Sequence, residues 1–262
     1  MSHGASVGGD TDTVTPATIQ VHRAGRQFLT RADGIESRHC FSFGEHYDPD
    51  NVGHGALLVS NDERVRAGAG FPDHPHRDAE IVTWVLSGSL VHEDSTGHRG
   101  VVQPGLAQRL SAGRGVVHSE RNDTYALDPT HPAEPVHFVQ SWVRPDRAGV
   151  PPAYEQAEID LAELRTGWLP VASGHHPDAA VSLGAAGATL WVTVLAPGAT
   201  RTLPSAGLAH LYLPSGAVGL ASGSPRPDDE LATGDSVRVT GEAGLAVTGR
   251  QEAELMLWTL AP

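Results

Sequence analysis

Two short motifs place metal-binding side chains two residues apart. His74 and His76 are separated by one proline, and His118 and Glu120 by one serine. In a β-strand, residues i and i+2 point to the same face about 6.6 Å apart, so each pair can direct two ligand atoms at one cation. If neighbouring strands carry both motifs, they supply three nitrogens and one oxygen to a mononuclear metal site. A histidine at a strand end also serves as a surface or hydrogen-bonded residue, and this alternative stays open for either motif alone.

The donor set narrows the kind of metal. Cys40 is the single cysteine, so an intrachain disulfide and a thiolate cluster are excluded. Imidazoles with a carboxylate suit Fe(II), Mn, Co, Ni, Cu or Zn, and we expect one divalent transition metal, with Fe(II) first. Four protein ligands leave one or two positions for a substrate oxygen and dioxygen, as in an open catalytic site. We interpret the other histidines, His92 among them, as structural or solvated.

Composition excludes several classes of protein. The 262 residues are 39% hydrophobic and include 30 Gly and 19 Pro, which is typical of a globular chain rich in turns. The formal net charge of −13 disfavours nucleic acid as a partner. No run approaches the ~18 consecutive apolar residues of a membrane helix, and the N-terminus has no apolar signal region. We therefore expect a cytoplasmic monomer without a membrane or nucleic-acid partner.

The elements that must position the two motifs are predicted to be β-strands. Short runs rich in β-branched residues alternate with Gly-, Pro- and Ser-containing turns, at the spacing of β-sandwiches and barrels. The sequence therefore predicts an all-β fold. The clearest strands are predicted at 81–86, 89–92, 116–120, 136–143, 188–195, 208–213, 236–240, 245–248 and 254–260.

The chain divides into four predicted segments. We expect a flexible tail over 1–17, an N-terminal barrel with the metal site over 18–143, a connection over 144–177 and a C-terminal barrel over 178–262. The connection is rich in Pro, Ala and acidic residues, and a short helix is predicted near 155–165.

A weak internal repeat favours two copies of one barrel unit. LSGSLVHEDSTG aligns with LPSGAVGLASGS, and SAGRGVVHSE with TGEAGLAVTGRQE, although shared turn chemistry would also explain the match. In this alignment the four candidate ligands face residues that cannot replace them, so the C-terminal barrel is expected to lack a metal site. Those residues are Thr202, Pro204, Val247 and Gly249.

The segment around both motifs also resembles a known family. Residues 70–122, GFPDHPHRDAEIVTWVLSGSLVHEDSTGHRGVVQPGLAQRLSAGRGVVHSERN, resemble the signature region of the pirin family within the cupin superfamily, and look most like bacterial pirin-like proteins with quercetinase activity. Looser similarity covers 41–65, 138–156 and 253–260. The resemblance implies two tandem cupin-type β-barrels, a bicupin. It also implies a set of metal ligands, which are His74, His76, His118 and Glu120.

The sequence leaves open which glutamate is the carboxylate ligand. In the wider cupin pattern, a glutamate a few residues after the H-x-H motif binds the metal, and Glu80 occupies that place. We favour Glu120 because the pirin-type resemblance is closer, and Glu80 would then orient a ligand imidazole.

The resemblance further implies a function. It predicts a metal-dependent dioxygenase of the quercetin 2,3-dioxygenase type, which cleaves a flavonol ring with dioxygen. The metal would lower the pKa of the substrate hydroxyl, and Glu120 would be both ligand and catalytic base. Two alternatives stay open. One is a metal-loaded pirin-like protein that regulates a protein partner, and the other is a cupin enzyme acting on a different small metabolite.

Overall fold

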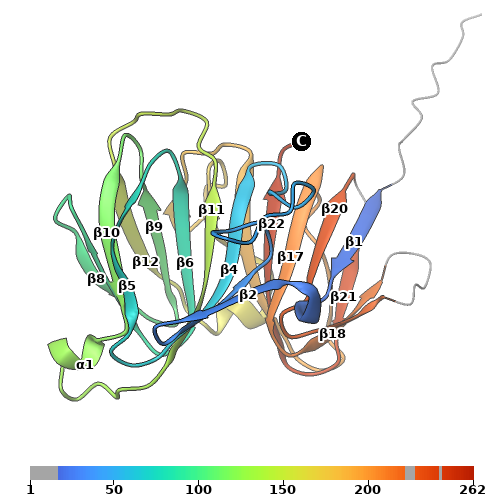
Figure 1. Cartoon of the computed structure of the whole chain (residues 1–262). Helices are drawn as coiled ribbons and strands as arrows, with labels where there is room; N and C mark the ends of the chain where they lie inside the picture. Colours follow the sequence, from blue (N-terminus) through green and yellow to red (C-terminus); the bar gives the residue numbers. More distant parts are fainter. Residues whose placement is uncertain (1–16, 222–227, 242–243) are drawn as a thin grey trace, which may run out of the picture.

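Two β units form the molecule, each made of one seven-stranded and one four-stranded sheet (Figure 1). The structure is a computed structural model that describes residues 17–221, 228–241 and 244–262. It confirms the predicted all-β fold with two tandem cupin-type barrels. The predicted tail at 1–17 lies outside the described residues, apart from its last position.

The N-terminal unit carries both candidate metal-binding motifs. Its large sheet has the order β12 (Ala153–Glu158), β9 (Leu106–Ser111), β6 (Glu80–Ser87), β11 (Val136–Val143), β4 (Leu57–Val65), β3 (Ile35–His39) and β2 (Phe28–Ala32). Its small sheet has the order β5 (Gly70–His76), β10 (Val116–Arg121), β7 (Leu90–Asp94) and β8 (Arg99–Val102). One helical turn, α1 (Thr124–Leu127), follows β10.

The C-terminal unit repeats this arrangement. Its large sheet has the order β1 (Thr18–His22), β20 (Ser236–Thr240), β17 (Leu208–Ser215), β22 (Ala253–Leu260), β15 (Ala188–Leu195), β13 (Leu169–Ser173) and β14 (Val181–Ser182). Its small sheet has the order β16 (Thr200–Thr202), β21 (Ala246–Gly249), β18 (Ala217–Ala221) and β19 (Glu230–Ala232). The β16–β21 pair thus takes the place that β5 and β10 hold in the first unit.

The chain crosses between the units twice. β1 belongs to the segment 18–143, which was predicted as the N-terminal barrel, but it pairs with β20 of the second unit. The chain then passes through the short helix η1 (Ala24–Arg26), and β2 joins the first unit. Inside 144–177, β12 pairs with β9 of the first unit, and η2 (Glu163–Arg165) precedes β13. The helix predicted near 155–165 is therefore wrong apart from that single turn, because residues 153–158 hydrogen-bond to the edge of a sheet instead.

Successive side chains of a strand point to opposite faces of the sheet and pack into different hydrophobic clusters. In β6, Val82 and Trp84 belong to a buried cluster shared by both units, whereas Ile81 and Val85 pack inside the first unit. The cluster inside the second unit contains residues such as Leu211 and Val247. The two large sheets therefore pack against each other, and each small sheet covers its own unit.

Hydrogen bonds between side chains join the two large sheets. Trp84 Nε1 donates to Glu254 Oε1 over 2.7 Å, and Trp258 Nε1 donates to Ser141 Oγ over 3.1 Å. Because these groups are buried, each bond satisfies a donor that would otherwise be costly to desolvate. The described residues contain no helix that is both long enough and apolar enough to cross a membrane.

Candidate metal centre

β5 and β10 pair antiparallel and bring the two motifs together. His118 stands directly opposite His74, and the register shifts between His118 and Glu120. Such an irregularity, with two residues facing one, turns the strand locally and re-aims its side chains. The spacing of each motif and the pairing of the two strands thus gather residues that lie more than 40 positions apart.

Three imidazoles meet at this place. The ring centroids are 4.8 Å apart for His74 and His76, 4.4 Å for His74 and His118, and 4.8 Å for His76 and His118. One nitrogen of each ring lies within 4.8 Å of the other two. His76 is 9% exposed and His118 only 2%. Three nitrogen donors therefore converge, with His76 and His118 buried and His74 partly exposed.

The free nitrogens of these rings fit a metal ion. The Nε2 atoms of His76 and His118 are buried and have no hydrogen-bond partner. Desolvation lowers the pKa of His76 to about 4 and that of His118 to about 2, so both rings are neutral at neutral pH. His74 Nδ1 donates to the carbonyl of Pro72 over 2.8 Å, which leaves Nε2 of a neutral ring with its lone pair. Buried lone pairs without donors are what a cation would satisfy.

Glu120 lies beside His118 in a second possible group. That group consists of His92, His118 and Glu120, and it shares only His118 with the triad of imidazoles. The Glu120 carboxylate is 2% exposed and accepts hydrogen bonds from Gln140 Nε2 at 2.9 Å to each oxygen. Burial raises its pKa to about 7, although Gln140 and Thr83 act in the opposite direction.

Gln140 is held in place by Trp142. The amide oxygen of Gln140 accepts a hydrogen bond from Trp142 Nε1 over 3.0 Å, which turns its amide nitrogen towards Glu120. The Trp142 ring lies edge-on to His76, 4.7 Å between centroids, and Phe43 packs against the same ring at 5.5 Å. β11 therefore orients the carboxylate and also supplies an aromatic wall next to the imidazoles.

Glu80 occupies a different environment. It is 1% exposed, accepts hydrogen bonds from Ser111 Oγ over 2.8 Å and from the backbone N–H of Gly184 over 3.1 Å, and belongs to neither ligand group. Its carboxylate thus joins β9 to the segment after β14, and the described contacts do not connect it to a ligand imidazole.

His92, expected from the sequence to be structural or solvated, lies next to His118 in this centre. His92 is fully buried, and its Nδ1 lies 3.4 Å from Nδ1 of His118, while its Nε2 lies 3.4 Å from Asp94 Oδ2. If His118 Nδ1 carries a proton and donates it to His92, then His92 donates from Nε2 to Asp94, and Nε2 of His118 keeps its lone pair. His92 and Asp94 are two residues apart on one strand, so the spacing that singled out the other motifs was also present here.

The corresponding place in the second unit carries different chemistry. β16 and β21 pair with Thr202 opposite Ala246 and Arg201 opposite Val247. Among the described residues, both groups able to hold a metal lie in the first unit.

Comparisons with known proteins place the chain in a family. Residues 11–143 match the Pirin family. A Mycobacterium bovis protein named "Putative quercetin 2,3-dioxygenase" is 47% identical over 245 residues, which cover 93% of this chain and 96% of that protein. Escherichia coli quercetin 2,3-dioxygenase is 42% identical over 145 residues, 55% of this chain and 60% of the enzyme.

The solved structures agree with this result. The crystal structure of YhhW from Escherichia coli has a TM-score of 0.82 at 29% identity and covers 94% of this chain and 98% of that chain. The same bacterial pirin in complex with nickel(II) has a TM-score of 0.81 at 28% identity, with coverage of 94% and 100%. By sequence and by fold, the chain belongs to the pirin family.

Proposed function

We propose that this protein is a metal-dependent dioxygenase of the quercetin 2,3-dioxygenase type, with one divalent transition metal held by His74, His76, His118 and Glu120. The observation that carries the proposal is the pair of buried, unpartnered Nε2 atoms of His76 and His118, which converge with His74. Relatives named quercetin 2,3-dioxygenase support the reaction type, and the nickel complex of a similar pirin supports a divalent metal.

The donor set suits the proposed metal. Three imidazoles and one carboxylate, without sulfur, accept Fe(II), Ni(II) and the other late divalent ions of the first transition row. When bound, such an ion acts as a Lewis acid that favours the ionised form of a hydroxyl group on the substrate. Fe(II) remains our first choice of native metal.

Glu120 is the proposed catalytic base. In the metal-free protein, burial raises the pKa of its carboxylate to about 7, and a bound cation would lower this pKa and favour the ionised form, which accepts a proton from a flavonol hydroxyl. Gln140 donates to both carboxylate oxygens and so fixes the orientation of the acceptor. The bond from Trp142 to Gln140 holds this donor in turn.

Aromatic side chains next to the imidazoles suit a flat aromatic substrate. Trp142 and Phe43 pack at 5.5 Å with their rings nearly perpendicular, and Phe71 lies 6.3 Å from His74. Such rings would keep water away from the Glu120 carboxylate and from the ionised hydroxyl of the substrate. Their faces and edges can pack against the rings of a polyphenol.

Oxygen uptake with quercetin tests the proposal. Metal-stripped protein is reconstituted separately with Fe(II), Mn, Co, Ni, Cu and Zn, and oxygen consumption is followed with and without the flavonol. We expect metal-dependent uptake that is lost in His118→Ala and kept in His175→Ala, since His175 is exposed and lies in the second unit. Absence of uptake in protein that holds one metal per chain would refute the dioxygenase assignment. Full uptake by His118→Ala would refute the site.

A further inference from the structure

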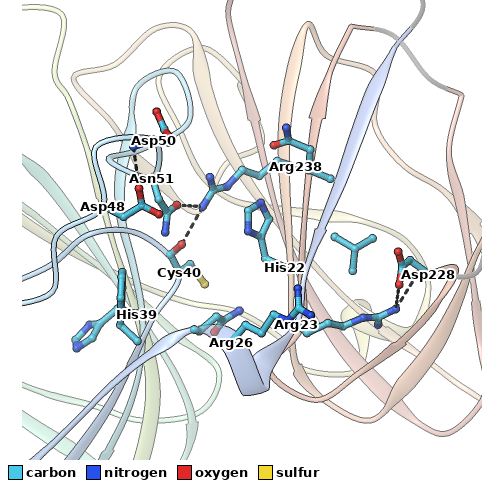
Figure 2. A pocket seen from close by; sticks show the side chains of 14 residues that line it. His22, Arg23, Arg26, His39, Cys40, Asp48, Asp50, Asn51, Asp228 and Arg238 are labelled. Carbon is cyan, nitrogen blue, oxygen red and sulfur yellow. Dashed lines mark hydrogen bonds and ion pairs between the residues drawn. The ribbon is translucent and has the colours of Figure 1, made fainter.

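A cavity lies where the chain crosses between the two units. Its volume is about 740 Å³, and it is lined by β1, η1, the segment around residues 48–51 and β20 (Figure 2). This volume is within the range of sites that hold small organic molecules. Its lining shares no residue with either histidine group of the candidate metal centre.

Arg238 is the central group of this cavity. It extends from β20 towards the first unit, where its Nη2 donates to the carbonyl of Cys40 over 2.9 Å and to Asn51 Oδ1 (Figure 2). Its Cζ atom lies 4.3 Å above the centre of the Phe41 ring. The residue is only 5% exposed, and its Nε is buried without a hydrogen-bond partner.

This buried guanidinium lacks a counter-ion. Within the described part of the chain, no carboxylate oxygen lies within 4.0 Å of its nitrogens, and Asp48 acts on it only from further away. Removing a charge from water without pairing it with an opposite charge is energetically unfavourable. Arginine stays protonated in proteins, so the cost cannot be avoided by loss of the proton. An anion in the cavity would supply the missing partner.

The neighbouring cations differ from Arg238. Arg23 forms ion pairs with Asp235 over 2.8 Å and with Asp228 over 3.0 Å, so its charge is already balanced. Arg26 is exposed to solvent, where a charge costs little. The unbalanced buried charge of the cavity is therefore that of Arg238.

Two further polar atoms of the lining have no partner. His22 Nε2 and Gln27 Oε1 are buried and unpaired. Burial, together with the charge of Arg238, lowers the pKa of His22 to about 4, so its ring is neutral and can donate from Nε2. Gln27 donates its amide nitrogen to the carbonyl of Gly234, and its amide oxygen still needs a donor. A ligand that reached these two residues would need an acceptor for His22 and a donor for Gln27.

The remaining lining restricts the charge and shape of the ligand. The carboxylates of Asp48 and Asp50 also line the cavity. They would repel a ligand with several negative charges more strongly than a ligand with one. Val21 and Phe28 add apolar surface. These features together suit a singly charged molecule with an apolar body.

We propose that this cavity binds a small monocarboxylate that also carries a hydroxyl group. Its carboxylate accepts hydrogen bonds from Arg238 and His22, and its hydroxyl donates to Gln27 Oε1. The site is independent of the candidate metal centre, because the two share no residue.

Isothermal titration with three matched probes tests the proposal. 3-Hydroxybenzoate carries both groups, benzoate lacks the hydroxyl, and 3-hydroxybenzyl alcohol lacks the charge. We expect 3-hydroxybenzoate to bind, and the alcohol to bind at least tenfold more weakly, since a hydrogen bond to a charged group contributes about a factor of ten or more. On addition of the acid, the NMR signal of the Arg238 Nε–H group should shift.

Variants separate the roles of the lining residues. Arg238→Gln should weaken binding of the acid at least tenfold, whereas Arg250→Gln, at an exposed arginine of the same unit, should leave it unchanged. Gln27→Leu keeps Arg238 and should abolish the preference for 3-hydroxybenzoate over benzoate, which tests the site even if Arg238→Gln does not fold. Binding should persist in His118→Ala.

Three results would overturn the proposal. They are equal binding of the acid and the alcohol, an unmoved Arg238 signal at millimolar acid, and unchanged affinity in a folded Arg238→Gln protein. Binding that disappears in His118→Ala would place the ligand at the histidines and would also overturn it.

Discussion

Replacing His92 by phenylalanine tests how the candidate metal centre is held. The ring of His92 stacks on Tyr154 with centroids 4.8 Å apart, and a phenyl ring can keep that contact. What the change removes is the acceptor for His118 Nδ1, 3.4 Å away. Asp94 retains partners on both oxygens. Oδ2, which His92 contacts, also lies 3.3 Å from His98 Nδ1, and Oδ1 accepts from the Thr96 backbone at 2.8 Å and hydroxyl at 2.6 Å. The substitution therefore targets the proton on His118 and spares the fold.

The magnitude follows from the length of the lost bond. Removal of a partner that orients a metal-binding histidine costs about 10- to 100-fold in metal affinity. Because 3.4 Å is long for a hydrogen bond between nitrogens, we expect the lower end, about tenfold or ~1.4 kcal/mol. If His92 were itself a ligand, its loss should match that of His74→Ala.

Competition titration with Ni(II) measures this effect. The control is His98→Phe, since His98 stacks on the same Tyr154 ring at 5.1 Å and contacts the same Asp94, but has no contact with His118. We expect His98→Phe to stay within about twofold of the wild-type affinity. Equal Ni(II) affinity of His92→Phe and the wild-type protein, with both folded, would refute the reasoning.

Three further predictions concern stability and are measured by urea unfolding. Burial raises the pKa of Glu63 to about 8, so between about pH 5 and pH 8 the unfolded chain loses this proton while the folded chain keeps it, and stability falls as pH rises. Glu63→Gln should remove this loss, on the order of a few kcal/mol across the window, and parallel pH curves would contradict it. Tyr212→Phe removes the donor 2.8 Å from Asp62 across the two units and should cost about 1–3 kcal/mol; an unchanged unfolding free energy would contradict this. Gly216→Ala should cost roughly 3 kcal/mol, because its φ is +89° and a Cβ would overlap the carbonyl of Glu252, whereas Gly97→Ala, at φ +95° in open space, should cost about 1 kcal/mol; equal losses would contradict the steric argument.

Much of the fold was predictable because the strands carry a local signal. The strands predicted at 136–143, 188–195 and 236–240 coincide with β11, β15 and β20, where β-branched residues alternate between two buried faces. β12 was mistaken for a helix start, since its acidic residues and preceding prolines match local helix rules, and only pairing with β9 decides the outcome. The exchange of β1 into the second unit is likewise a long-range event without a local signal.

The candidate site divides in the same way. The two motifs and the resemblance to pirins predict His74, His76, His118 and Glu120 as one set of ligands, and in the structure the pairing of β5 with β10 places His118 opposite His74. The contacts of Gln140 with Glu120 and of Trp142 with His76 could not be predicted, because they depend on where β11 lies in the fold and no local sequence pattern indicates them. The Arg238 cavity is lined by residues of both units, so it could not be predicted from the sequence either.

A crystal structure of the Ni(II)-loaded protein, with anomalous differences measured at the nickel edge, tests the central claim most directly. We predict one strong peak per chain, about 2.0–2.2 Å from the Nε2 atoms of His74, His76 and His118 and from a carboxylate oxygen of Glu120. A peak bound by His92 in place of His74 and His76, or by Glu80 in place of Glu120, would contradict the account, as would the absence of a peak between β5 and β10.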